Sequence, residues 1–161
     1  MTTIRTAILV HEGGMRFAAT TGTGRTPVFG DHPAEAELSP VEIVVAALAA
    51  CSAMDVVSIA LKKRQDFVRY EVHVRAEQRD EYPQVLSYID VVHEVEGDAV
   101  SVDAIRSCIT LSASKYCPVN AMLSAGATEI HHRMRILRSD SEAIEEEVIV
   151  TGPYRRPEVL A

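Results

Sequence analysis

The stretch from Ser39 to Arg64 is the feature that most limits what this chain can fold into. Ser39 can cap a helix, Pro40 suits the first helical position, and Glu42 follows the cap at the capping-box spacing. The basic residues 62–64 end this helix. Between its two ends nearly every face of the helix is apolar, which predicts a long helix that is buried on all sides. Because Glu42 and Asp55 interrupt the apolar run and no second such segment accompanies it, we expect a core helix rather than a membrane span.

Periodicity predicts the other elements. Strands are expected over residues 3–10, 15–20, 68–79, 85–95 and 128–137, a short strand in the glycine-rich stretch near residue 27, and helices over 103–115 and 118–124. The main order, βββ-α-ββ-α-β, is typical of an α+β domain with two buried helices. One small sheet cannot cover a long helix that lacks a polar face, so we expect a symmetric homodimer that shares the helix layers.

Composition excludes several classes of function. The chain has 161 residues, the length of one domain, and a net charge of −7, which disfavours binding to nucleic acid. Its first ten residues lack the pattern of a signal peptide, and three cysteines are an odd number for a secreted disulfide framework. We therefore expect a cytoplasmic protein with free thiols.

Cys51 lies in the middle of the predicted long helix among small residues, which leave space beside its sulfur. A buried structural role fits the same pattern, because free cysteine is among the most buried residue types. The helix N-terminus is about three turns away and Asp55 is about 40° around the helix, so the thiol pKa should be raised. A reactive Cys51 thus needs a cation from elsewhere in the fold; Arg16 is the best placed by sequence pattern, and Lys115 is another possibility.

Cys117 precedes Pro118 at a helix boundary, where a thiol is usually more accessible than within a helix, although a structural role is about equally compatible. Cys108 falls among aliphatic residues and is predicted to be core. The chain has no Cys-x-x-Cys, His-x-x-x-His or His-Glu-x-x-His pattern, and the adjacent His131 and His132 would point to opposite faces of a strand. No metal site and no cofactor are therefore expected.

Two motifs carry a resemblance to a known family. The run Ser39-Pro40-Val41-Glu42, followed by AALAAC over 46–51 and MDVV over 54–57, resembles the first-helix signature of the OsmC/Ohr family, the osmotically inducible and organic hydroperoxide resistance proteins. The run KYCPV over 115–119 resembles the second cysteine motif of that family. The likeness implies an OsmC-like domain over residues 1–137 that forms an intertwined homodimer, with residues 138–161 as an extension of uncertain structure, either a short helix and strand or a frayed end.

The resemblance also implies a chemistry. Cys51 would attack an organic hydroperoxide as a thiolate, Cys117 would resolve the resulting sulfenic acid as a disulfide, and a dithiol, of lipoyl type in the family, would reduce it. Arg16 matches the strand arginine that stabilises the thiolate. In the well-studied peroxidases an acidic residue directly follows the proline, but here Val41 does, and Glu42 lies nine residues before Cys51, about 180° around the helix.

Glu42 is thus better explained as the capping acid, which places the chain nearer the less characterised OsmC-like branch. The leading hypothesis is a thiol-dependent peroxidase in peroxide stress defence. The alternative is a non-catalytic protein of the same fold that binds a small molecule or senses redox state.

Overall fold

The computed structural model describes residues 4–13, 15–25, 27–29 and 38–153. It divides into an N-terminal unit, residues 1–44, and a C-terminal unit, residues 45–161, with the boundary inside α1 (Pro40–Lys62). The N-terminal unit holds an antiparallel sheet of β1 (Ala7–Gly13), β2 (Arg16–Thr21) and β3 (Val28–Phe29), in that order. The three strands expected before the long helix are therefore present.

The start of α1 is closed by reciprocal hydrogen bonds. The Ser39 backbone N–H donates to Glu42 Oε2 at 2.8 Å, and the Glu42 backbone N–H donates to Ser39 Oγ at 3.2 Å. The hydrogen bonds from Ser39 hold the pKa of the Glu42 carboxyl below its ordinary value. The predicted capping box is confirmed.

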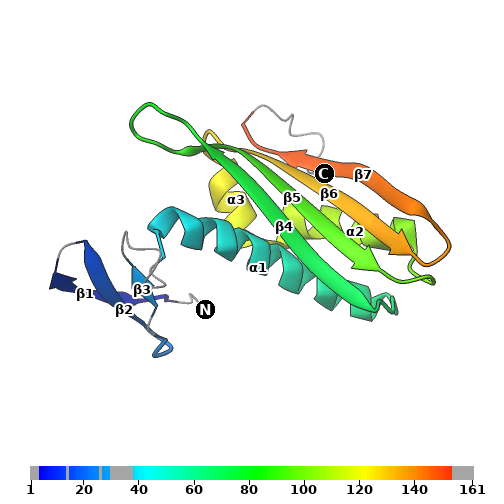
Figure 1. Cartoon of the computed structure of the whole chain (residues 1–161), viewed down its shortest axis with the longest axis horizontal. Helices are drawn as coiled ribbons and strands as arrows, with labels where there is room; N and C mark the ends of the chain where they lie inside the picture. The colour runs from blue at the N-terminus through cyan, green and yellow to red at the C-terminus, as the bar shows by residue number, and fades with distance from the viewer. Residues whose placement is uncertain (1–3, 14, 26, 30–37, 154–161) are drawn as a thin grey trace. The chain divides into compact units, whose positions relative to one another are not determined.

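The C-terminal unit is a four-stranded sheet with helices on one face (Figure 1). The strands are β4 (Arg69–Gln78), β5 (Leu86–Glu96), β6 (Glu129–Arg138) and β7 (Ser141–Thr151), in that order. β5 and β6 are parallel, whereas the two outer pairs are antiparallel. A parallel pair needs a crossover connection, and this one contains α2 (Val102–Leu111) and α3 (Pro118–Ser124).

Alternation along the strands builds the core. The even-numbered residues of β6 from 130 to 136 face inward and are buried, as are the odd-numbered residues of β5 from 89 to 95. They pack against apolar side chains of α1 and α2, and the central cluster includes Val56, Ala60, Ile105, Cys108 and Ile109. The α+β class and the burial of Cys108 are both confirmed.

Helix α1 buries one stripe and not its whole surface. Leu48, Ser52, Val56 and Ala60, each one turn apart, are the buried residues, whereas Met54 is 74% exposed. By length and composition alone, the helix could also cross a membrane. The prediction of burial all round is therefore not met by the single chain, because one sheet covers only one side of the helix.

The helix predicted over 103–115 changes its winding before it ends. α2 ends at Leu111 and is followed by a π-helical segment, η2 (Ser112–Tyr116), which the Cys117 backbone N–H closes by donating to the Ser112 carbonyl at 2.9 Å. The helical stretch still ends before Cys117 and Pro118, as expected.

Beyond residue 137, the described residues contain the strand of one predicted alternative but not its short helix. Residues 141–151 form a continuous strand, β7, with no helix in that range, and the strand pairs antiparallel with β6. The acidic side chains of β7 meet arginines: Glu145 contacts Arg135 at 3.0 Å, and Glu146 contacts Arg106 of α2 at 2.7 Å. Local sequence does not reveal these long-range partners. Residues 154–161 lie outside the described residues.

Candidate active site

The structure brings the two candidate cysteines together. The sulfurs of Cys51 and Cys117 and a carboxylate oxygen of Asp55 all lie within 4.8 Å of one another. Both cysteines are free thiols. Two sulfurs that are 66 residues apart in the sequence therefore share one site with a carboxylate.

Two helices supply these groups. Cys51 and Asp55 lie one turn apart on α1, so their side chains lie on the same side of that helix. Cys117 is the N-cap of α3, where its sulfur accepts a hydrogen bond from the Asn120 backbone N–H at 3.3 Å, and Pro118 occupies the first helical position. The capping geometry turns the sulfur inward, into the structure.

The accessibility of the two thiols is the reverse of the prediction. Cys117 is 2% exposed, whereas Cys51 is partly exposed. Burial, together with a hydrogen bond to the Cys51 thiol, raises the pKa of Cys117. The prediction of an accessible Cys117 was wrong because the sulfur itself serves as the helix cap. Cys51 is thus the thiol that a substrate reaches more easily.

Serine side chains connect the Asp55 carboxylate to the interior. Ser112, the first residue of η2, donates its hydroxyl to Asp55 Oδ2 at 3.0 Å. Its oxygen also lies 3.3 Å from Ser52 Oγ, the one hydroxyl in the buried stripe of α1. Ser52 Oγ in turn lies 3.4 Å from Nε2 of the buried His93. A chain of polar contacts therefore runs from the thiol site into the core.

Two buried imidazoles continue this chain. Tyr70 Oη lies 2.7 Å from His93 Nδ1, His93 Nε2 lies 3.5 Å from His132 Nδ1, and His132 Nε2 lies 2.9 Å from Asn120 Oδ1. The Asn120 amide nitrogen donates to the Ala113 carbonyl at 2.8 Å, which leaves its oxygen as the acceptor. One tautomer satisfies the chain: each ring is protonated at Nε2, and the Tyr70 hydroxyl donates to His93 Nδ1.

The network fixes the backbone that holds Cys117. Asn120 accepts from His132 through its side chain and donates to Cys117 through its backbone N–H. Burial lowers the pKa of His93 to about 3 and that of His132 to about 4, so both rings are neutral at physiological pH. The sequence reasoning missed His93, Asn120 and the two serines; the available signal was a polar side chain at an inward, otherwise aliphatic position.

The remaining predicted site residues lie elsewhere in the chain. Arg16 and Glu42 belong to the N-terminal unit, where Arg16 contacts Glu12 at 3.1 Å and Glu42 closes the capping box. Their roles beside the cysteines stay predictions. Lys115 lies over the ring of Tyr116, 5.4 Å from its centroid. Among the described residues, none of the groups that shift the pKa of Cys117 is a cation.

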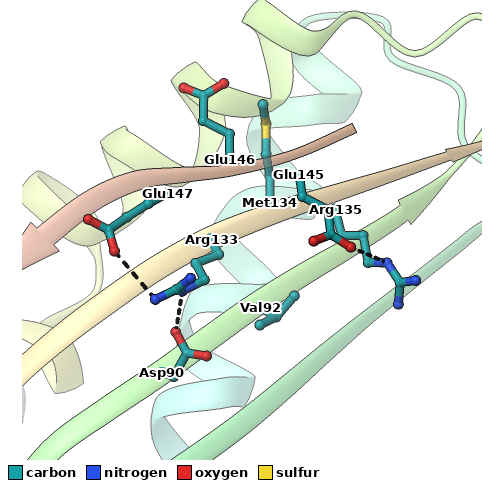
Figure 2. Close-up of a pocket in the computed structure, with 8 residues that line it drawn as sticks. All are labelled: Asp90, Val92, Arg133, Met134, Arg135, Glu145, Glu146 and Glu147. Carbon is teal, nitrogen blue, oxygen red and sulfur yellow. Dashed lines mark hydrogen bonds and ion pairs between the residues drawn. The ribbon is translucent and has the colours of Figure 1, made fainter. Parts of the chain in front are cut away.

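A hollow on the outer face of the sheet offers a different chemistry. Figure 2 shows that charged side chains of β5, β6 and β7 line it. Arg133 contacts Asp90 at 2.7 Å and Glu147 at 3.5 Å, so these charges are already paired. The lining contains no thiol, and its arginines on β6, Arg133 and Arg135, point to the opposite face from His132, so we place the candidate site at the cysteines.

Comparisons with known proteins identify what the chain is similar to. The family model described as OsmC-like protein matches residues 32–133. Protein YhfA of Escherichia coli K12 is 35% identical over 118 residues, which are 73% of this chain and 88% of YhfA. The crystal structure of a hypothetical protein from Aquifex aeolicus VF5 has a TM-score of 0.76 at 22% identity, covering 86% of this chain and 100% of that one. An organic hydroperoxide resistance protein OsmC from Legionella pneumophila has a TM-score of 0.62 at 10% identity, covering 84% and 98%.

The neutral histidines predict a pH dependence of stability. An unfolded histidine has a pKa of about 6.5, so between that pH and about 4 the unfolded chain binds protons that folded His93 and His132 do not. The free energy of unfolding should therefore fall as the pH falls. The loss of unfolding free energy between pH 6 and pH 5 should be smaller in His132→Gln than in the wild type by about 1 kcal/mol. Urea unfolding at the two pH values measures it.

The adjacent His131 provides the matched control. Although burial opposes it, hydrogen bonds to Glu147 and Glu129 raise the pKa of His131. The stabilisation that protonated His131 contributes is thus fully present below the pKa of histidine in the unfolded chain. It is lost only as the pH rises through the raised pKa of His131 in the folded chain. His131→Gln should leave the loss between pH 6 and pH 5 nearly unchanged, and an equal effect of both variants would contradict the assignment.

Proposed function

Because this chain belongs to the OsmC-like protein family, we propose that it is a thiol-dependent peroxidase that reduces organic hydroperoxides. The family includes organic hydroperoxide resistance proteins among its solved structures. The observation that carries the proposal is the placement of the Cys51 and Cys117 sulfurs within 4.8 Å of each other. Formation of a disulfide requires this proximity, followed by closure to about 2.05 Å.

The two thiols take different roles because their environments differ. Cys51 is partly exposed and attacks the hydroperoxide as a thiolate, forming an S–O bond as the O–O bond breaks. The alkoxide that leaves takes up a proton and becomes the alcohol. Cys117, which is buried, then gives up its thiol proton and attacks the Cys51 sulfenic acid; the S–S bond forms as the S–O bond breaks, and the hydroxyl leaves with the proton as water.

A dithiol completes the cycle by thiol–disulfide exchange, and its own sulfurs end as a disulfide. A lipoyl-type dithiol is the reductant that the family resemblance implies. The positive charge that a reactive Cys51 thiolate needs is assigned to Arg16, as the family resemblance implies. We place this chemistry in the cytoplasm as part of the defence against peroxide stress.

Exposed apolar side chains support the homodimer as part of this proposal. Met54 and Leu61 of α1 and Met122 of α3 are each more than 60% exposed in the single chain. Met54 and Leu61 are two turns apart and so lie on one side of α1, and large exposed apolar surfaces mark interfaces. A second copy would cover the faces of α1 that the sheet leaves open.

We expect sedimentation equilibrium to give twice the chain mass of 17.6 kDa. Leu61→Glu should weaken the dimer because it places a charge in the proposed interface. The matched variant Glu77→Gln, which changes a charge on exposed β4, should leave the mass unchanged. A monomeric wild-type chain would contradict the proposed assembly.

Substitution of single cysteines tests the chemistry. With cumene hydroperoxide and a dithiol, Cys51→Ser should reduce peroxide consumption to the rate without protein. Cys117→Ser should still form one sulfenic acid per chain at Cys51, detected by mass spectrometry, but should not form the intramolecular disulfide. Cys108→Ala is the control, because Cys108 lies in the core away from the site, and its activity should equal that of the wild type.

Activity that survives Cys51→Ser would exclude the peroxidase assignment. A redox sensor or a small-molecule-binding protein would then be the better description. The sensor in particular would form the Cys51–Cys117 disulfide without turning over peroxide and dithiol.

Arg16 and Glu42 are expected to differ in importance. Arg16→Met should lower kcat/KM for the hydroperoxide by about 100-fold if its charge stabilises the thiolate and the developing alkoxide. Glu42→Gln should leave activity unchanged and alter stability by only a few tenths of a kcal/mol, because glutamine also completes a capping box. A large loss of kcat with Glu42→Gln at unchanged stability would instead assign Glu42 to the active site.

A further inference from the structure

We propose that Cys51, Asp55 and Cys117 form a binding site for a thiophilic divalent cation, of which Zn²⁺ is the representative. One ligand atom from each residue lies within 4.8 Å of the other two. Zinc binds thiolate sulfur at about 2.3 Å and carboxylate oxygen at about 2.0–2.2 Å, so neighbouring ligand atoms around a tetrahedral ion lie about 3.6–3.8 Å apart. Small side-chain adjustments bring the three atoms to that spacing.

The charges in the site favour a cation. Binding converts both thiols to thiolates, forms two S–metal bonds and one O–metal bond, and releases two protons to solvent. Two thiolates and a carboxylate carry three negative charges, which the dication largely neutralises. Two thiolates are the soft ligands that select zinc and similar ions over magnesium and calcium.

Hydrogen bonds orient two of the three ligands. Ser112 donates to Asp55 Oδ2 at 3.0 Å, and the Asn120 backbone N–H donates to Cys117 Sγ at 3.3 Å. Partners of this kind fix the direction of ligand groups around metals. Cys51 and Asp55 are both partly exposed, which provides an entry path and leaves the fourth position for water.

No local sequence motif marks this arrangement. Cys51 and Asp55 supply two ligands at i and i+4 on one helix, but the third comes from Cys117, 66 residues later. Only the crossover between β5 and β6 brings the third ligand to the first two.

Metal binding and thiol oxidation would exclude each other. A bound cation engages both sulfurs, so neither can attack a peroxide nor join the other in a disulfide. The metal site goes beyond the proposed peroxidase and does not depend on it, because metal binding is measured on the fully reduced protein without peroxide.

The first test is titration of the reduced protein with Cd²⁺ under anaerobic conditions, monitored by the ultraviolet thiolate-to-metal charge-transfer absorption. The second measures Zn²⁺ affinity by competition between the protein and a chromophoric chelator. We expect one ion per chain. Cys51→Ser and Cys117→Ser should each abolish the absorption, and Asp55→Asn should weaken Zn²⁺ binding at least about 10-fold. Far-ultraviolet circular dichroism checks that each variant is folded.

Two matched controls separate this site from others. Cys108→Ala removes the third thiol, and His73→Ala disrupts the cluster of Glu71, His73 and Glu94 on the sheet surface; both should leave the stoichiometry and affinity unchanged. Binding that persists in Cys117→Ser, that is unaffected by Asp55→Asn, or that is lost in His73→Ala would overturn the proposal. A protein that consumes peroxide but binds no metal would contradict the metal-site proposal alone. A protein that binds metal but consumes no peroxide would contradict the peroxidase proposal alone.

Discussion

The parallel pairing of β5 with β6 is the constraint on which the rest of the structure depends. Two parallel neighbours cannot be joined by a tight turn, so the chain has to leave the sheet after Glu96 and return at Glu129 from the other end. The connection contains α2, η2 and α3 and covers one face of the sheet together with α1. Cys117 lies on this connection, and its meeting with Cys51 follows from the pairing.

Much of the fold could be predicted from short-range patterns. The helix cap at Ser39, the alternation along β5 and β6, and the opposite directions of His131 and His132 all follow from periods that are visible in the sequence. The pairing of β7 was not predictable in this way, because the acidic residues of that strand are satisfied by arginines far away in the chain, such as Arg106.

The sequence predicts which cysteines form the site, but not how buried they are or which groups they contact. Cys51 and Asp55 are neighbours by helix geometry alone, so their proximity was visible in advance. The burial of Cys117 was not, because nothing in the local sequence shows that a sulfur will act as the N-cap of the next helix. The polar chain through His93 and His132 also depends on tertiary packing, which sets these rings side by side in an apolar core.

The π-helical segment η2 has a consequence for how the site tolerates changes in chain length. A π turn accommodates one residue more than an α turn, and each residue of a helix advances the direction of the next side chain by about 100°. Loss of a single residue between Ser112 and Tyr116 would be taken up by a return to regular α winding, with the side chains beyond it kept nearly in phase. This turn is therefore the place in the crossover where the chain can be one residue shorter and still aim the second sulfur at the first.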